Sequence, residues 1–340
     1  MDIIRVIEEI RTGVRNFLPD DPFMMIQEEL VCALSSYWET AEHILKDSGI
    51  TLMPPPRDYA SLEKNFFSAL FLYSYHRAGI PLERRILYAA VNQCLRGMVT
   101  GCDNIMDDEY KETLVTDLPG RSLRFRSVLD IMVSDRILCE LLFKHFIEDH
   151  MSTPQFLDAI AVSISALTRS GAQEASEEGG VDSVLPPEQV LETVHHFKTG
   201  LLFMCPWSVP RIIEDYSSMG IDALLDGLYK IGLGCQVMDD MVDLPRDIGK
   251  RRHNFVASLI YYQSGAGQWD RLKAQALESG DKGKCIGQFP HAVSQAVQVA
   301  RQYLGEGLRG LFDQRHWALV EPTMRFLSQR IGTEHIMYPV

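Results

Sequence analysis

The chain has 340 residues, of which 46% are apolar and 23% are charged, and its formal net charge at pH 7 is −13. This composition is typical of a globular protein with a large core. The excess of acidic residues argues against nucleic acid and against anionic membrane surfaces as general partners. No stretch approaches the roughly 20 apolar residues of a membrane span, so we expect no transmembrane segment.

The N-terminal residues 2–18 carry charges among their apolar positions, which predicts an amphipathic helix and not a signal peptide. The seven cysteines form no C-x-x-C pair, and most lie in apolar stretches. This pattern favours reduced core residues in a cytoplasmic protein over a disulfide set or a zinc site. The ten histidines are scattered, and we predict no metal role for them.

Apolar residues recur at three- and four-residue spacing along most of the chain, and convincing alternating strands are absent. Proline and glycine clusters separate the periodic segments, notably Pro54-Pro55-Pro56, Pro119-Gly120, the run 170–187 and the glycines between 265 and 283. About ten helices predict one all-α domain over residues 1–340, a bundle around a central cavity. The predicted helices span residues 2–18, 23–48, 59–78, 82–114, 121–150, 153–170, 187–217, 220–244, 250–264, 286–313 and 318–331.

Two acidic clusters end apolar, helix-compatible stretches. Asp103 and Asp107 are four residues apart and share one helix face, and Asp239 and Asp243 share another, with Asp240 beside them. Like charges at this spacing disfavour a helix unless something neutralises them. Carboxylates together with substrate phosphate are the usual ligands of Mg²⁺. Two such faces across a helical bundle would hold several Mg²⁺ ions and a diphosphate.

A solvated, salt-bridged surface helix is the competing interpretation of each cluster. Such a helix carries Lys or Arg at four-residue spacing from its acids. Here only Lys111, four residues after Asp107, fits that pattern. The second cluster has no such partner, which favours the metal interpretation.

The sequence reads KTGLLF from Lys198 and, about thirty residues later, GLGCQVMDDMVDLPRDIGK. This pattern resembles the trans-isoprenyl diphosphate synthases, which have a Lys-Thr-Gly/Ala step, a Gln-x-x-Asp-Asp-x-x-Asp block and a Gly-Lys pair. The first cluster, DNIMDDE, is similar to their first aspartate-rich motif, with Asn104 in place of the second aspartate. The resemblance covers roughly residues 60 to 260. The matching residues of the second block are Lys198, Thr199, Gln236, Asp239, Asp240, Asp243, Gly249 and Lys250.

The resemblance implies the isoprenoid synthase fold, an allylic prenyl diphosphate as substrate and Mg²⁺ as cofactor, three ions with bound diphosphate. Dimerisation is common in the family, so a homodimer is one expected state. The implied metal ligands are Asp103, Asp107, Asp239 and Asp243. The implied catalytic residues are Asp103, Asp107, Asp239 and Lys198. The residues expected to bind substrate are Lys64, Arg96, Lys198, Gln236 and Lys250.

Two departures from the family pattern concern the site of a second substrate, isopentenyl diphosphate. The family's Gly-Gly-Lys-x-x-Arg motif reads LEKNFFSAL here, with Lys64 kept and Phe67 in place of the arginine. The Arg-Arg-Gly that follows the first aspartate motif is replaced by YKETL, with Lys111 alone. We therefore expect a class I terpene synthase, a lyase that ionises the allylic diphosphate without elongating it. The alternatives are a chain-elongating prenyltransferase and a non-catalytic partner subunit.

Arg96 lies seven residues before Asp103 and thus on the same helix face. A buried arginine there is costly unless it is paired. Two interpretations stay open, a sensor of the diphosphate and a structural partner of Asp103. Aromatic residues near Lys64 and Lys198 are predicted as plain core or as walls of a carbocation cavity, namely Phe66, Phe67, Phe71, Tyr73, Phe203 and Trp207.

Overall fold

The computed structural model describes residues 22–148, 150–215, 220–263, 269–270, 272–273 and 287–339. The helix predicted over residues 2–18 lies outside the described residues. So do the glycines predicted to mark a loop between 265 and 283. The described part of the chain is helical, and its one strand-like pairing is an isolated antiparallel bridge between Leu52 and Thr116. The all-α prediction is therefore confirmed.

Two compact units make up the chain. The first holds residues up to 167 together with 206–221, and the second holds 168–205 together with 222 onward. The single domain expected over residues 1–340 stays a prediction. Helices of the first unit are α2 (Pro22–Leu45), α3 (Phe66–Arg77), α4 (Leu82–Asp107), α5 (Leu123–Ile147), most of α6 (Thr153–Ser176) and α8 (Pro210–Ile213). The second unit contains α7 (Pro187–Gln189), the π-helix η1 (Val190–Gly200), most of the 3₁₀ helix η2 (Leu202–Trp207), α9 (Asp222–Lys250), α10 (Phe255–Gln263), α13 (Pro290–Leu311), the 3₁₀ helix η4 (Gln314–Leu319), α14 (Val320–Ile331) and α15 (Glu334–Met337).

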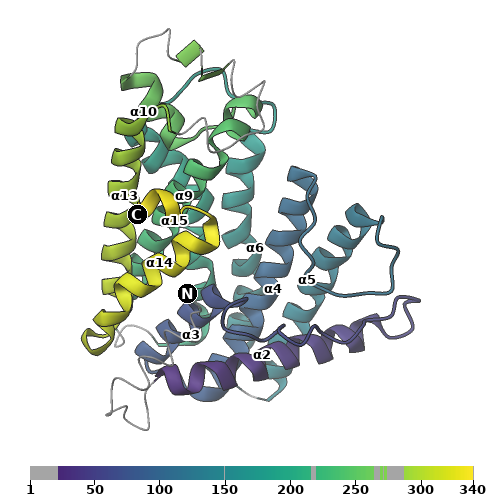
Figure 1. The fold of residues 1–340 in the computed structure, drawn as a ribbon. Helices are drawn as coiled ribbons and strands as arrows, with labels where there is room; N and C mark the ends of the chain where they lie inside the picture. Colours follow the sequence, from purple (N-terminus) through teal and green to yellow (C-terminus); the bar gives the residue numbers. More distant parts are fainter. Residues whose placement is uncertain are drawn as a thin grey trace. The chain divides into compact units, whose positions relative to one another are not determined.

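Helices α4 and α5 lie side by side in the first unit (Figure 1). Glycines on one face of α4 make this approach close. A Cβ added to Gly101 would lie 2.6 Å from Cγ1 of Ile131 and 2.7 Å from the backbone oxygen of Ser127. Since Gly101 lies two residues before Asp103, α5 fixes the position of that end of α4.

A buried ion cluster joins α2, α3 and α4. Nη2 and Nε of Arg85 bind the two oxygens of Glu29 at 2.5 and 3.0 Å, and Nε2 of His76 lies 3.1 Å from Glu29 Oε2. Glu29 is only 2% exposed. Burial alone would raise its pKa, but the hydrogen bonds from His76 and Arg85 reverse that effect and lower it. The charge of Glu29 is thus compensated within the core.

Helices α9 and α13 pack together in the second unit (Figure 1). They meet through Gly227 and Gly307, where a Cβ on Gly227 would lie 2.8 Å from the oxygen of Gly307. Helix α9 continues through Pro245 to Lys250, beyond the end predicted at residue 244. Pro245 and its neighbour Leu244 are buried, so packing compensates for the lost backbone hydrogen bond. The whole second acidic cluster therefore lies within one helix.

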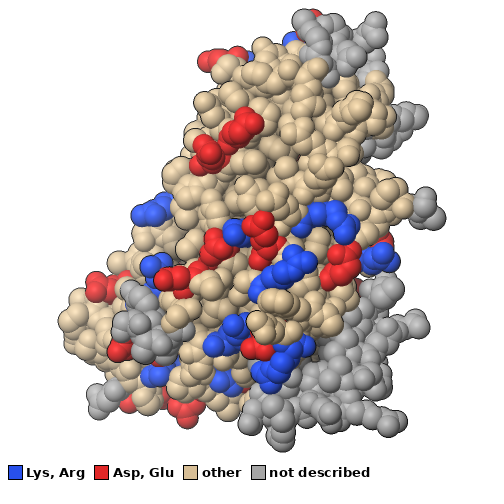
Figure 2. Space-filling view, turned by 90° about the vertical axis from the view of Figure 1, so that its left-hand side faces the viewer, with Lys and Arg blue, Asp and Glu red and all other residues tan. Residues whose placement is uncertain are grey.

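Other predicted boundaries differ at loops that propensity does not define. Helix α4 ends at Asp107 and not near residue 114, and α6 continues to Ser176 where a loop was expected from residue 170. Residues 190–200 form a π-helix, which helical periodicity does not separate from an α-helix. Among the helices that the structure describes, none is both long and apolar enough to cross a lipid bilayer. On the face drawn in Figure 2, basic and acidic side chains are interspersed.

Candidate active site

The first acidic cluster occupies the last turn of α4. Asp103 and Asp107 are both half-buried, and Asp107 is the last residue of the helix. Asp108 follows in the left-handed conformation with a φ of 54° and ends the helix. Negative side chains at a helix C-terminus are unfavourable because the carbonyl groups there already carry partial negative charge. A cation bound to Asp103 and Asp107 would relieve this unfavourable interaction with the helix end and also the repulsion between the two carboxylates. These residues therefore fit a metal ion.

Asn104 is a structural residue in this cluster. It is 4% exposed, its Nδ2 donates to the carbonyl oxygen of Lys111 at 3.0 Å, and its Oδ1 accepts from the Lys111 amide at 2.8 Å. A carboxylate could accept the second bond but could not donate the first. The substitution that distinguishes this motif from the family pattern thus holds the loop after α4.

The two adjacent aspartates of the second cluster lie in different environments on α9. Asp239 is exposed and Asp240 is 2% exposed. Although the Asp239 side chain reaches solvent, the many protein atoms around its carboxylate displace part of its hydration; the charges of Asp243 and Asp240 add to this, so its pKa rises to about 6. Lys198 and Arg246 only partly oppose the shift. This excess of negative charge around an accessible carboxylate fits a divalent cation.

Asp240 connects three segments of the second unit. Its Oδ2 lies 2.9 Å from Nε2 of His195 in η1 and accepts from the amide of Phe255 at the start of α10. Its Oδ1 accepts from Nε2 of Gln236 at 3.1 Å. Gln236, predicted to bind substrate, is 4% exposed and directs its amide to Asp240. The structure thus gives Gln236 a supporting contact inside α9.

Asp243 and Asp247 follow on the buried side of α9. Oδ2 of Asp243 accepts from Nη2 of Arg246 at 2.5 Å, and the residue is 8% exposed. Oδ2 of Asp247 accepts from Nδ2 of Asn254 at 2.9 Å. Burial and the charge of Asp240 raise the pKa of Asp247 to about 7. Asp243, predicted as a metal ligand, therefore already has a cationic partner.

Lys198 lies in the π-helix η1 and is half-buried. Its Nζ pairs with Oε1 of Glu174 on α6 at 2.9 Å. Burial favours the neutral amine, but Glu174, Asp247 and Asp240 outweigh it and raise the lysine pKa above its usual value. Lys198 is therefore a cation held among the carboxylates of Glu174, Asp240 and Asp247 in the second unit. π-Helical turns occur frequently at functional sites.

Lys64 and Asn65, the residue that Arg96 contacts, directly precede α3. Nη1 of Arg96 donates to Oδ1 of Asn65 at 2.8 Å, and Lys64 precedes that asparagine directly. Arg96 is exposed, so it carries no burial cost. Nζ of Lys64 lies 2.8 Å from Asp58. Lys250, the last residue of α9, is also exposed. In the first unit, Arg96 thus contacts the residue that follows Lys64, while the Lys64 ammonium pairs with Asp58.

The aromatic candidates divide into core and half-buried residues. Trp207 is fully buried, and its Nε1 donates to Ser74 at 2.9 Å while its ring meets Tyr75 edge-on. Phe66 and Tyr73 are buried as well. Phe67, Phe71 and Phe203 are half-buried. Trp207, Phe66 and Tyr73 therefore belong to the core.

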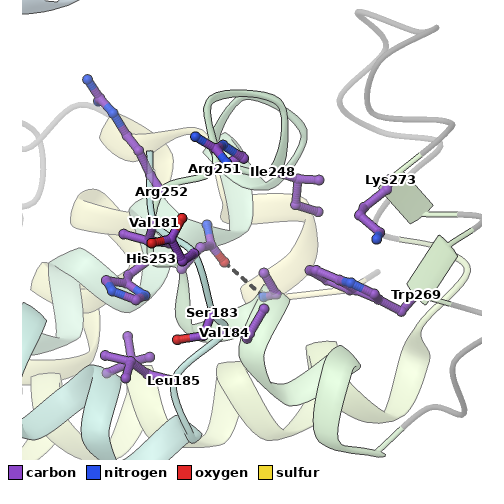
Figure 3. A pocket seen from close by; sticks show the side chains of 14 residues that line it. Val181, Ser183, Val184, Leu185, Ile248, Arg251, Arg252, His253, Trp269 and Lys273 are labelled. Carbon is purple, nitrogen blue, oxygen red and sulfur yellow. Dashed lines mark hydrogen bonds between the residues drawn. The ribbon is translucent and has the colours of Figure 1, made fainter. Parts of the chain in front are cut away.

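A separate cavity of about 220 Å³ lies in the second unit beyond the end of α9 (Figure 3). Arg251, Arg252 and Lys273 contribute cations to its lining, and Trp269 contributes an indole ring. The backbone around it is fixed by the amide of Val181, which donates to the Arg251 oxygen at 2.8 Å. None of the predicted site residues lines this cavity.

Sequence reasoning missed several residues that hold the predicted ones. Glu174 and His195 contact Lys198 and Asp240, and Asn254 binds both Asp247 and the backbone oxygen of Asp240. His195 precedes Lys198 by three residues, a spacing that brings two helical side chains near each other. The contacts of Glu174 and Asn254 cross between elements, so no local pattern reveals them.

Solved structures of prenyl diphosphate synthases are similar to this chain. Geranylgeranyl pyrophosphate synthase from Lactobacillus brevis matches with a TM-score of 0.64 and 15% identity, over 91% of this chain and 100% of that one. Geranylgeranyl pyrophosphate synthetase from Pyrococcus horikoshii matches at 0.58 and 16% identity, covering 90% and 95%. A polyprenyl synthase from Caulobacter crescentus, complexed with calcium and isoprenyl diphosphate, matches at 0.56 and 15% identity, covering 92% and 98%.

No family model and no curated protein matches the chain. The structural matches extend over nine-tenths of the chain and nearly the whole of each neighbour. The chain therefore has the all-α isoprenoid synthase fold, and the resemblance inferred from the aspartate motifs is confirmed at the level of the fold.

Proposed function

We propose that the protein is a Mg²⁺-dependent enzyme that ionises an allylic prenyl diphosphate and transfers the resulting prenyl group. The observation that carries this proposal is the isoprenoid synthase fold together with an acidic cluster at each of the two expected places, the end of α4 and the middle of α9. A neighbour with the same fold is described in complex with calcium and isoprenyl diphosphate, which supports a divalent ion and this class of substrate.

Asp103, Asp107 and Asp239 are the residues that we assign to the metal ions, with Asp243 at the edge of the second cluster. Bound Mg²⁺ would supply positive charge to the leaving diphosphate. Lys198, held as a cation by Glu174, would bind a diphosphate oxygen and stabilise the charge that develops as the carbon–oxygen bond breaks. Lys250 would add a second cation from the end of α9. Asp240 and Gln236 would keep this part of α9 in place.

Chain elongation is the outcome that the comparisons favour, in preference to the cyclisation expected from sequence. The synthases reported above carry the names of enzymes that make longer prenyl chains. Lys64 directly precedes Asn65 in the sequence, and Arg96 donates to the side chain of Asn65, so we assign these two cations to a second diphosphate. We infer that this pair substitutes for the arginine that Phe67 replaces and for the Arg-Arg-Gly that is missing after the first aspartate motif.

Cyclisation or hydrolysis of the allylic substrate alone is the second candidate. The observation that favours it is the half-buried Phe67 where the elongating enzymes have a cation. Charge-assisted contacts are worth roughly 1.5–3 kcal/mol each. Losing two of them would weaken binding of isopentenyl diphosphate by about a hundredfold or more, since ~1.4 kcal/mol is tenfold.

One assay separates these functions. The protein is incubated with Mg²⁺ and allylic diphosphates of several lengths, with and without isopentenyl diphosphate, and the products are identified by mass spectrometry. Elongated diphosphates support the proposal, while hydrocarbons or alcohols formed without isopentenyl diphosphate support cyclisation. A complete lack of turnover would point to a non-catalytic subunit.

Two sets of variants assign the residues. Asp107→Ala and Asp239→Ala should each lower turnover by orders of magnitude while the fold stays intact, and wild-type turnover in either would refute the metal assignment. Arg96→Gln and Lys64→Met should raise the KM for isopentenyl diphosphate at least tenfold and leave that for the allylic substrate unchanged. Lys46→Met, which removes an exposed lysine elsewhere in the first unit, is the control.

A further inference from the structure

Three side chains capable of binding a metal meet where α5 ends, outside both aspartate clusters. His145 lies in the last turn of α5, Glu148 follows the helix and His150 comes two residues later. One ligand atom from each lies within 4.8 Å of the others. Oε2 of Glu148 is 3.8 Å from Nε2 of His150, and the two imidazole centroids are 4.6 Å apart. All three residues belong to the first unit.

His145 supplies a second, independent observation. The residue is 8% exposed, and its Nε2 is buried without a hydrogen-bond partner among the described residues. A buried polar atom without a partner costs roughly 1–3 kcal/mol, and such atoms are rare in folded proteins. A ligand near this imidazole would account for its presence in the core.

We propose that His145, Glu148 and His150 bind a zinc ion that fastens the end of α5 to the segment leading into α6. Two imidazole nitrogens and one carboxylate oxygen form a known zinc ligand set, with a water molecule in the fourth position. Zinc–ligand bonds of about 2.0–2.2 Å place tetrahedral ligands roughly 3.3–3.6 Å apart. Glu148 and His150 are exposed, so their side chains can close the remaining distance by turning.

The chemistry of the site selects zinc over magnesium. Mg²⁺ takes oxygen ligands in octahedral geometry, whereas imidazole nitrogens suit zinc and its neighbours in the first transition row. The site also lies at the C-terminus of a 25-residue helix, where the backbone carbonyls favour a cation. The zinc ion is therefore distinct from the Mg²⁺ ions of the proposed active site.

From the sequence we predicted no metal role for the histidines, because they are scattered and have no Cys or carboxylate partners at the expected ligand spacing. The motif His-x-x-Glu-x-His crosses the end of α5, where α5 stops at Ile147. Its second histidine reaches the first because the chain turns back, with the amide of His150 donating to the oxygen of His145 at 3.3 Å. Only the structure shows that turn.

The test measures zinc binding by competition with a chromogenic chelator, in the presence of millimolar Mg²⁺ to occupy the aspartate clusters. Wild-type protein should bind one zinc ion, and His150→Ala and Glu148→Gln should each weaken that binding at least tenfold. His43→Ala is the matched control, because His43 and Glu140 form an exposed pair at 3.0 Å to which the described part of the chain adds no third ligand. Its zinc affinity should equal that of wild type.

Thermal unfolding gives the second readout. Zinc should raise the melting temperature of wild type and His43→Ala but not of His150→Ala. Without zinc, His150→Ala should melt like wild type because the side chain is exposed, which separates loss of the ion from loss of the fold. Unchanged zinc affinity in His150→Ala would overturn the proposal, as would zinc binding that disappears only in Asp239→Asn.

Discussion

The Asn104 side chain exchanges two hydrogen bonds with the backbone of Lys111, and it is the residue that departs from the usual aspartate motif. A buried amide that satisfies both a donor and an acceptor stabilises the loop and leaves no charge to compensate. Asp103 and Asp107 are the two carboxylates of this turn that we assign to the metal ions.

Asn104→Asp should destabilise the protein and should not strengthen metal binding. The carboxylate would leave the Lys111 carbonyl without its donor and add a third negative charge, at a cost of about 1–3 kcal/mol. Chemical unfolding in urea measures the loss, and calorimetric titration with Mg²⁺ and diphosphate measures the affinity. Tighter Mg²⁺ binding in this variant would contradict the structural role.

Asp130 on α5 is a buried carboxyl group with one oxygen that has no hydrogen-bond partner among the described residues. Burial is the main cause that raises its pKa to about 7, and the charge of Glu112 adds to it. In the unfolded chain the same group titrates near 3.9. Between these two pH values the folded state binds the extra proton, so stability falls as the pH rises from 4 to 7.

Asp130→Asn should remove that pH dependence. The variant and wild type should be about equally stable near pH 4, and the variant should be more stable at pH 8, by up to about 4 kcal/mol. Urea unfolding at pH 4 and pH 8 is the measurement. Equal stability of the two proteins at pH 8 would show that the Asp130 carboxylate is accommodated without cost.

At the scale of the elements, close helix contacts determine where the acidic clusters lie. The Gly101 backbone approaches Ser127 and Ile131 of α5, which positions the last turn of α4. Gly101→Ala should cost about 1–3 kcal/mol because α5 must move away. It should also lower turnover, because Asp103 and Asp107 move with the helix end.

Gly171→Ala in α6 is the matched control for that prediction, since a Cβ there meets no atom within 4 Å. An alanine in a helix interior is favoured over glycine by up to about 1 kcal/mol. Thermal unfolding and turnover of both variants separate crowding from the intrinsic preference of the helix. Similar melting temperatures for the two would show that α4 and α5 tolerate extra volume.

Sequence patterns predicted the helical class, most helices and the residues of both acidic clusters. They could not predict that α4 stops at Asp107, because the loop after it is held by the side chain of Asn104. They also missed the π-helix, whose apolar spacing resembles that of an α-helix. Glu174 escaped notice because its contact with Lys198 joins residues 24 positions apart on different elements.

At the scale of the whole molecule, the net charge of −13 opposes the binding of a diphosphate unless cations accompany it. Mg²⁺ with diphosphate should therefore raise the melting temperature far more than either component alone. At a ligand concentration 100 times Kd the gain is about 2.7 kcal/mol. Scanning calorimetry measures the shift.

Asp239→Asn is the control for that experiment. The variant should lose most of the ligand-induced shift yet melt at or slightly above the wild-type temperature when no ligand is present. The reason is that desolvation first, and then the charges of Asp243 and Asp240, raise the pKa of Asp239 and disfavour its carboxylate. An equal response of variant and wild type to Mg²⁺ with diphosphate would exclude Asp239 as a ligand.

The contacts of Asp240 imply that substitutions of the adjacent residues Asp239 and Asp240 would have different effects in a library of variants. Asp240 binds His195, Gln236 and the amide of Phe255, so its replacement removes anchors from three segments at once. Cells would contain less of the folded protein. Replacement of Asp239 would leave the amount of protein unchanged and abolish only the product. Measuring both protein abundance and product for variants at each position would therefore distinguish a residue needed for folding, Asp240, from a residue needed for the reaction, Asp239.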